Sequence, residues 1–229
     1  MPRRTLCQCL CYDGLMLTYK PLRAVLFDWD GTLLDSFRAD TNAYLQMFRA
    51  LGVSWEPTRL AQHYSPDWHN VYRAAELAPE RWAEADRLWR RFYRLERPLL
   101  HSGARCVVQR LAERFRLGLV SSGSSLRVRS QIRAFGLERL FAVSIFGDRV
   151  PHRKPHPLQL RLAIRQLGFE PASCVYIGDA PEDVKMARHS GVAVVGVLEH
   201  SPAPERLRES RPNALIRTIS ALPGLFWHS

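Results

Sequence analysis

The chain alternates short apolar runs with longer segments of helical spacing, and this alternation constrains the fold more than any other feature. Runs of this kind are typical of strands that are buried on both faces of a parallel sheet. The five runs are Ala24–Phe27, Leu117–Val120, Ala142–Phe146, Cys174–Ile177 and Ala193–Val197. Helical segments lie between most of them, which favours an α/β protein with helices on both sides of the sheet.

One long segment, residues 37–100, breaks the alternation because it contains no strand-like run. A first helix is expected from Ser36 to Leu51 and a second from Pro79 to a stop at Pro98. Apolar residues of the second helix form one stripe, made of Trp82, Ala85, Leu88, Trp89, Phe92 and Leu95. The expected architecture is a Rossmann-like parallel sheet core, formed by residues 21–36 and 101–229, with an inserted α-helical domain at 37–100.

The net charge of +11 raises the question of nucleic-acid binding. The excess is spread along the chain, without the block of consecutive like charges that marks a basic arm. All but three of the 33 basic residues are Arg, the exceptions being Lys20, Lys154 and Lys185, which indicates a compositional bias. We therefore expect a solvated basic surface that attracts anionic small molecules, and no specific nucleic-acid partner.

Residues 1–20 precede the first predicted strand and are interpreted as an N-terminal extension. One interpretation is that this extension is disordered. The other is that translation starts at Met16, so that residues 1–15 do not belong to the protein. No small-residue cleavage site follows their weakly apolar stretch. The odd total of five cysteines does not suggest a disulfide framework, and no apolar run approaches the roughly 20 residues of a membrane helix. A cytoplasmic protein without a membrane partner is the expectation.

Two acidic residues follow the first apolar run, in the sequence Asp28-Trp29-Asp30-Gly31-Thr32. Residues two apart in an extended segment project to the same side, so Asp28 and Asp30 are expected to point together from the carboxyl end of the strand. Open parallel sheets bind ligands there. Two carboxylates this close repel each other unless a cation or a shared proton offsets the charge. A plain Asp-Gly turn is the structural alternative.

The fourth run ends similarly, with Asp179 at the strand end and Asp183 in the first turn of the next helix. The helix dipole favours a carboxylate at Asp183, so helix capping is an alternative account of that residue but not of Asp179. Hard cations such as Mg²⁺ prefer carboxylate oxygens and leave room for water and phosphate. Acidic residues at two strand ends of one sheet therefore predict a Mg²⁺ site.

Two further elements are suited to an anion. The second run ends in Ser121-Ser122-Gly123-Ser124 before a predicted helix, and hydroxyls and amides there can bind an anion. An ordinary loop with a helix N-cap is the alternative. Lys154 precedes a proline-fixed turn at a helix start, in a chain that otherwise uses Arg. A compact ammonium fits between carboxylates and phosphate where a broad guanidinium does not.

These four elements, in this order, resemble the haloacid dehalogenase-like hydrolase superfamily. Its pattern is DxDGT, a Ser or Thr after an apolar run, a Lys near KPxP, and GDxxxD. The chain carries DWDGTLLDS, LVSSGS, RKPHP and YIGDAPEDVKMARHSG, and the resemblance covers about residues 22–198. The helical insert at 37–100 resembles the α-helical cap of phosphoglycolate phosphatase-like members.

The resemblance implies a reaction. Asp28 would be the nucleophile that forms an aspartyl-phosphate, and Asp30 would be the general acid and then the base for water. The implied activity is that of a Mg²⁺-dependent phosphatase that hydrolyses a small phosphate monoester, of the phosphoglycolate or sugar phosphate type.

The resemblance also implies binding roles. Asp28, the carbonyl oxygen of Asp30, and Asp179 would hold Mg²⁺, and Asp183 would support the water shell of the metal. The phosphoryl oxygens would be bound by the remaining motif residues, Ser121, Ser122 and Lys154. The expected partner is a small phosphorylated metabolite.

Other activities compete with this interpretation. Dehalogenases do not need an acid two residues after the nucleophile, and Asp30 is present. Phosphonate-cleaving relatives use a cap lysine, and residues 37–100 contain none. A phosphomutase shares the core motifs and stays an alternative. A non-catalytic basic binding module is a second alternative, which the intact acidic motifs and Lys154 disfavour.

The helical insert offers candidate substrate contacts. Arg38, Arg59, Arg73 or a neighbour could bind a second anionic group, although a solvated helix face is the favoured interpretation for each. Four ring side chains could line a cleft or fill the core of the insert, and core filling is favoured for most of them; they are Trp55, Tyr64, Trp68 and His69.

Overall fold

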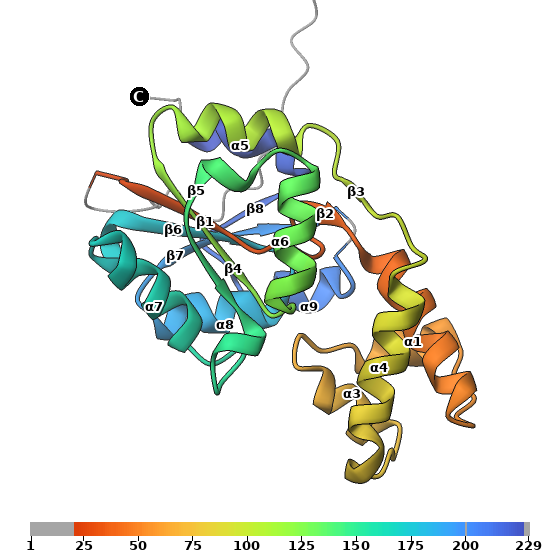
Figure 1. The fold of residues 1–229 in the computed structure, drawn as a ribbon. Coiled ribbons are helices and arrows are strands. Elements are labelled where there is room, and N and C mark those ends of the chain that lie inside the picture. The colour runs from red at the N-terminus through yellow and green to blue at the C-terminus, as the bar shows by residue number, and fades with distance from the viewer. Residues whose placement is uncertain (1–20, 200, 227–229) are drawn as a thin grey trace, which may run out of the picture.

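The computed structural model describes residues 21–199 and 201–226 (Figure 1). Its main sheet has six parallel strands in the order β5-β4-β1-β6-β7-β8. These strands are β1 (Ala24–Phe27), β4 (Arg116–Ser121), β5 (Phe141–Phe146), β6 (Cys174–Gly178), β7 (Ala193–Val197) and β8 (Ala214–Ile216). In β1, Ala24 pairs with Arg116 on one side and Cys174 on the other. The predicted α/β fold with a parallel sheet is confirmed.

Helices cover both faces of the sheet because successive residues of a strand point to opposite sides. Val25 and Phe27 of β1 pack on the face covered by α5 (Ala104–Ala112), α6 (Ser125–Ala134) and the 3₁₀ segment η5 (Ile219–Leu225). Ala24 and Leu26 pack on the opposite face. That face is covered by α7 (Leu158–Leu167), α8 (Pro181–His189) and α9 (Pro204–Glu209). Figure 1 shows α5 and α7 on opposite sides of the sheet.

All five predicted apolar runs are strands, with bounds that differ by at most one residue at either end. The strand β8 was not predicted. It has only three residues, and it is buried because it pairs with β7 and packs beneath α9 and η5. Such a short run gives too little periodicity to identify a strand from sequence. Short 3₁₀ turns, η2 (Glu138–Leu140), η3 (Gly147–Arg149) and η4 (Pro171–Ser173), connect the larger elements.

A two-stranded antiparallel ribbon marks where the chain leaves the core and returns to it. β2 (Leu34–Asp35) pairs with β3 (Leu99–Leu100). The expectation of no strand within residues 37–100 was therefore wrong at the last two residues of that segment. A two-residue strand is fixed by its pairing partner and leaves no pattern of its own.

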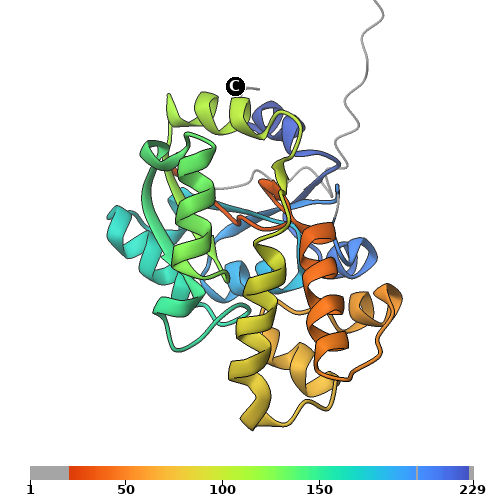
Figure 2. The same cartoon turned by 45° about the vertical axis from the view of Figure 1, so that its right-hand side comes forward.

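The segment between β2 and β3 is helical and has its own hydrophobic cluster (Figure 2). It consists of α1 (Phe37–Ala50), α2 (Pro57–His63), α3 (Trp68–Ala74), η1 (Pro79–Arg81) and α4 (Trp82–Tyr93). Figure 2 shows α1 and α4 side by side below the sheet. We call this segment the helical insert; the exact domain boundaries at residues 36 and 101 stay a prediction.

The second predicted helix of the insert ends earlier than expected. α4 stops at Tyr93, and Arg97 donates to the carbonyl oxygens of Arg94 (2.6 Å) and Glu96 (3.0 Å). Leu95 was assigned to the buried stripe but is 72% exposed, because it lies beyond the helix end, where the helical spacing no longer applies. The other five residues of the stripe pack in the insert.

The predicted N-terminal extension, residues 1–20, lies outside the described residues. None of the helices among the described residues has the length and apolar character needed to cross a membrane.

Candidate active site

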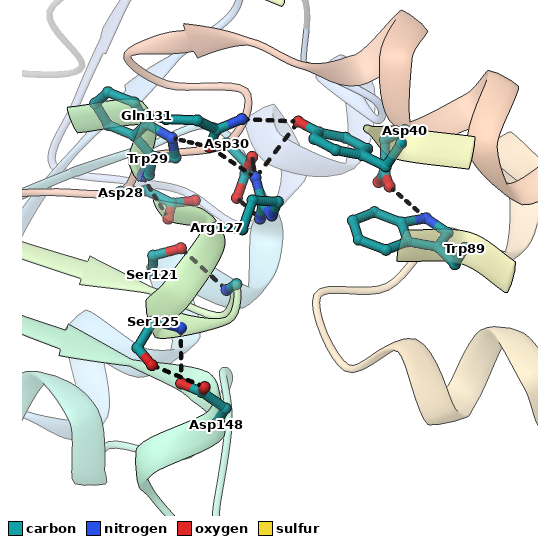
Figure 3. Close-up of polar contacts among 12 residues, drawn as sticks. Asp28, Trp29, Asp30, Asp40, Trp89, Ser121, Ser125, Arg127, Gln131 and Asp148 are labelled. Atoms are coloured by element: carbon teal, nitrogen blue, oxygen red, sulfur yellow. Dashed lines mark hydrogen bonds and ion pairs between the residues drawn. The ribbon is translucent and has the colours of Figure 1, made fainter. Parts of the chain in front are cut away.

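Strand β1 delivers Asp28 and Asp30 to the carboxyl edge of the sheet. The main-chain N–H of Asp28 donates to the carbonyl oxygen of Ile177 (2.9 Å), so Asp28 continues the ladder with β6. Trp29, between the two acids, is fully buried, and its indole Nε1 donates to Oε1 of Gln131 on α6 (3.0 Å). Both acidic residues line one pocket, but Asp28 pairs with Lys154, whereas Asp30 pairs with Arg127. Figure 3 shows the pair of Asp30 and Arg127.

The turn after Asp30 brings the β1 loop against the β6 loop. Gly31 has a φ of +81°, and a Cβ atom at this position would overlap the carboxylate of Asp179. The hydroxyl of Thr32 donates to Oδ1 of Asp179 (2.7 Å). Because only glycine tolerates both the conformation and the close approach, the Gly-Thr pair fixes where Asp179 lies relative to Asp28.

Three carboxylates converge at this point, those of Asp28, Asp179 and Asp183. All three are buried, and each offers an oxygen within 4.8 Å of the others. Burial raises the pKa of Asp28 to about 7, against the attraction of Lys154. Burial, with repulsion from the two other carboxylates, raises the pKa of Asp179 well above its usual value. Clustered oxygen ligands with unbalanced negative charge are suited to a hard divalent cation such as Mg²⁺.

Asp183 also stabilises the start of α8. Its Oδ2 accepts hydrogen bonds from the main-chain N–H groups of Asp179 (3.2 Å) and Ala180 (3.1 Å). Its Oδ1 accepts from the hydroxyl of Tyr176 (3.2 Å). The capping role considered for Asp183 is therefore present, and it fixes the orientation of the loop that carries Asp179.

Lys154 lies between two of these carboxylates. Its Nζ is 2.7 Å from Oδ1 of Asp28 and 2.8 Å from Oδ1 of Asp183. Burial lowers the pKa of Lys154, but the two carboxylates outweigh this effect and hold the pKa above its usual value. The ammonium is therefore charged, and it offsets part of the negative charge of the acidic cluster.

The loop after β4 presents two serines. Ser121 is fully buried, and its Oγ accepts from the main-chain N–H of Gly123 (3.0 Å), while its carbonyl oxygen accepts from Nε2 of Gln159 (3.0 Å). Ser122 lines the pocket. Its buried hydroxyl has no hydrogen-bond partner among the described residues, so it can serve a bound ligand.

The sequence did not indicate the partner of Asp30, which is Arg127 on α6. The guanidinium makes two parallel hydrogen bonds to Asp30, from Nη1 to Oδ1 (2.8 Å) and from Nη2 to Oδ2 (2.6 Å). Arg127 stands in the first turn of α6, where the helix dipole disfavours a cation. A basic residue at that position, next to a serine-rich loop, is the one sequence signal that could have identified it.

The pocket lies between the carboxyl edge of the sheet and the helical insert. From the core it is lined mainly by Asp28, Asp30, Gly31, Ser122, Arg127 and Asp179. From the insert it is lined by Asp40, Tyr64, Trp68, Trp89, Arg90 and Tyr93, among others. The side of the pocket formed by the insert is thus rich in aromatic side chains.

The candidate residues of the insert divide between core and pocket. Trp55 is buried in the cluster of the insert, and the ring of His69 stacks on Trp82 at 4.6 Å. Tyr64 and Trp68 pack against this cluster and also line the pocket. The three arginines considered as anion contacts, Arg38, Arg59 and Arg73, are exposed and are absent from the pocket lining.

Comparisons with known proteins define the class of this enzyme. A phosphoglycolate phosphatase from Chromobacterium violaceum is 30% identical over 194 residues, which cover 79% of this chain and 87% of the relative. The probable phosphatase IndB from Dickeya dadantii is 28% identical and covers 90% of this chain and 93% of its own length. The chain is a phosphohydrolase.

The family follows from a match over most of the chain. The family model described as haloacid dehalogenase-like hydrolase matches residues 25–197, and the chain belongs to this family. Among solved structures, that of a predicted phosphoglycolate phosphatase from Haemophilus somnus superposes with a TM-score of 0.81 at 19% identity. It covers 91% of this chain and 99% of its own, and it supports the fold assignment.

Proposed function

We propose that this protein is a Mg²⁺-dependent phosphatase that hydrolyses a small phosphate monoester through a phosphorylated Asp28. The observation that carries the proposal is the cluster of three buried carboxylates around Lys154, with Asp30 in the same pocket. Buried like charges are costly, and a binding function accounts for their presence at a sheet edge.

The residues present fit the metal. Oxygens of Asp28 and Asp179, together with the main-chain carbonyl oxygen of Asp30, would hold Mg²⁺, and Asp183 would support its water shell. The carboxylate of Asp30 is outside the three-carboxylate group because it pairs with Arg127, so only its carbonyl oxygen is proposed as a ligand. When bound, the cation draws negative charge from the phosphoryl group and offsets the repulsion among the carboxylates.

In the first step, Oδ of Asp28 attacks phosphorus, and the bond between phosphorus and the ester oxygen breaks. Asp30 gives its proton to the departing alcohol. In the second step, Asp30 accepts a proton from water, whose oxygen attacks phosphorus and releases phosphate from Asp28. Two carboxylates with different neighbours suit this division, since Asp28 lies beside Lys154 and Asp30 lies beside Arg127.

Binding of the phosphoryl group is assigned to Lys154 and to the serines of the loop after β4. Lys154, next to Asp28, supplies a fixed positive charge, and the unpartnered hydroxyl of Ser122 supplies a donor. Ser121 orients the loop through its bond with Gly123 and is the third proposed contact.

The proposed substrate is of the phosphoglycolate or sugar phosphate type. This choice rests on relatives, since several proteins that are 27–32% identical are named phosphoglycolate phosphatase. A phosphomutase of the same fold remains the alternative, and it would return the phosphoryl group to a second hydroxyl of a sugar phosphate. The proposed cellular location is the cytoplasm.

Hydrolysis of p-nitrophenyl phosphate, with Mg²⁺ or with a chelator, tests the proposal. We expect turnover by the wild type that requires Mg²⁺ and falls at least about a thousandfold in Asp28→Asn. Asp35→Asn is the matched control, because Asp35 lies on β2 outside the pocket lining. Equal turnover in wild type and Asp28→Asn would refute the mechanism. A panel of phosphate monoesters, including phosphoglycolate, then distinguishes phosphate release from transfer within a sugar phosphate.

A further inference from the structure

Arg127 fixes both carboxylate oxygens of Asp30. The two hydrogen bonds, of 2.8 and 2.6 Å, have the parallel geometry in which an arginine orients a carboxylate most firmly. Both side chains are largely shielded, at 17% exposure for Arg127 and 23% for Asp30. A surface ion pair would exchange readily with water, whereas this one is held inside the pocket.

Arg127 has further contacts with the helical insert and with Gln131 on its own helix. Its Nη1 also donates to the hydroxyl of Tyr93 on α4 (3.4 Å), and its guanidinium lies 5.0 Å from the centre of the Tyr93 ring and 5.8 Å from that of Trp89. Gln131, one helical turn beyond Arg127, accepts from Arg127 (3.1 Å) and donates to Tyr93 (3.4 Å). Figure 3 shows Arg127 with Asp30 on one side and Trp89 of the insert beyond.

Gln131 also reaches the loop of Asp30. Its Oε1 accepts from the indole of Trp29, the residue between Asp28 and Asp30. One face of α6, carrying Arg127 and Gln131, therefore contacts the acidic loop of the core and helix α4 of the insert at once. A change in the position of α4 must act on the same side chains that hold Asp30.

We infer that Arg127 is the positioning residue for Asp30, and that helix α4 of the insert, through Tyr93, sets how Arg127 holds it. This inference rests on the proposed function, since it concerns how the acid of that reaction is aligned. Proton delivery needs a carboxyl oxygen within hydrogen-bond reach of the departing oxygen. Each carboxyl oxygen has two lone-pair sites, so one site can carry the proton for the departing oxygen while the other accepts from Arg127.

The test compares two substrates that differ in their need for an acid. Phenyl phosphate has the poorer leaving group, and p-nitrophenyl phosphate has the same ring with a leaving group that needs little protonation. In Arg127→Met, which keeps most of the aliphatic stem, we expect kcat/KM to fall about a hundredfold for phenyl phosphate and less than about tenfold for p-nitrophenyl phosphate. Arg127→Lys keeps the charge without the fork, and should recover part of the loss for phenyl phosphate.

Arg129→Met is the matched control on the same helix. Arg129 is exposed and lies over the ring of Phe146 (4.9 Å), away from the pocket. Its substitution removes the same charge from α6 and should leave the ratio of the two kcat/KM values unchanged. Asp30→Asn serves as the reference for complete loss of the acid, and circular dichroism establishes that each variant is folded.

The contribution of the insert is measured with Tyr93→Phe, alone and combined with Arg127→Met. Tyr93→Phe keeps the ring and removes the hydroxyl that accepts from Arg127 and Gln131. We expect it to lower kcat/KM for phenyl phosphate about threefold more than for p-nitrophenyl phosphate. In the double variant this additional effect should disappear, because the hydroxyl acts through Arg127.

Two results would overturn the inference. If Arg127→Met and Arg127→Lys lower kcat/KM by the same factor for phenyl phosphate and for p-nitrophenyl phosphate, Arg127 has a general structural role. If the effect of Tyr93→Phe persists unchanged in the double variant, the insert does not act through Arg127. Failure of the proposed function is a separate result, in which the folded wild type with Mg²⁺ hydrolyses neither compound, and the inference then falls with it.

Discussion

Asp40, in the first turn of α1, shows that burial of a carboxyl group can outweigh the attraction of a nearby cation, here Arg127. It is 9% exposed, and burial raises its pKa to about 7, although the indole of Trp89 donates to it (3.1 Å). In the unfolded chain the pKa returns to its usual 3.8. Between these two values the folded state keeps a proton that the unfolded state has released, so stability decreases as pH rises through this window.

Asp40→Asn should remove this dependence. We expect the free energy of unfolding of the wild type to fall by up to about 4 kcal/mol relative to Asp40→Asn between pH 4 and pH 7. Urea unfolding of both proteins across this range measures the difference, and other titrating groups cancel in the comparison. Glu80→Gln, at an exposed position of the insert, should run parallel to the wild type. A parallel course for Asp40→Asn as well would contradict the prediction.

At the scale of single residues, the sequence was sufficient to predict the candidate site residues that lie at the ends of strands. Asp28 and Asp179 directly follow buried runs, and the parallel sheet brings such ends to one edge whatever the rest of the chain does. Arg127 was missed because its partners come from elsewhere: Asp30 lies 97 positions away and Tyr93 lies 34 positions away. The place of Arg127 in the first turn of α6 is a local signal, but it does not identify Asp30 or Tyr93 as the partners.

At the scale of elements, helix α6 begins on a cap supplied by another segment. Asp148, in the turn η3, accepts from the main-chain N–H of Ser125 (2.9 Å) and from its hydroxyl (2.9 Å). These bonds hold the start of the helix that carries Arg127, as Figure 3 shows. The residue at the N-cap position, Ser124, makes no capping bond with its own side chain.

Removal of this cap should weaken the fold. We expect Asp148→Ala to lower the free energy of unfolding by about 1–2 kcal/mol, since a buried helix end loses its acceptor. A lower midpoint of urea unfolding, with an unchanged dependence of the free energy on urea concentration, measures this loss of stability. Glu56→Ala is the matched control, because Glu56 stands at the start of α2 without a capping bond from its side chain. Equal midpoints for Asp148→Ala and Glu56→Ala would disprove the role of the cap.

The elements that sequence predicted well are those with enough residues to show a period. The strands β1, β4, β5, β6 and β7 met this condition, and so did helix α1. The ribbon β2–β3 and strand β8 depend on pairing partners, which no local pattern reveals. The early end of α4 is different, because it is accompanied by local hydrogen bonds from the side chain of Arg97 to the carbonyl oxygens of Arg94 and Glu96, which helical spacing does not reveal.

At the scale of the whole molecule, the acidic cluster joins segments that are far apart in the chain. Asp28 follows β1, whereas Asp179 and Asp183 follow β6. A divalent cation that binds only the folded arrangement stabilises all of it by mass action. We expect Mg²⁺ at millimolar concentration to raise the melting temperature by several degrees, measured by scanning calorimetry against NaCl of equal ionic strength.

Asp179→Asn should change the melting temperature in a way that depends on whether Mg²⁺ is present. Without Mg²⁺ its melting temperature should exceed that of the wild type, because one buried carboxylate with a raised pKa is gone. With Mg²⁺ the increase should be much smaller than in the wild type. Asp35→Asn, outside the cluster, should match the wild type in both conditions. If Mg²⁺ raises the melting temperature of Asp179→Asn as much as that of the wild type, Mg²⁺ does not bind at this cluster.

The central place of β1 has a consequence for the order in which the protein can fold during synthesis. β1 is synthesised before its neighbours in the sheet, β4 and β6, which end at Ser121 and Gly178. The contacts of the helical insert are local by comparison, so α1 to α4 can assemble while the strand ahead of them is still unpaired. We therefore expect the apolar strand β1 to stay unpaired until β4 and β6 have been synthesised, by which time the helical insert that lines the pocket can already have formed.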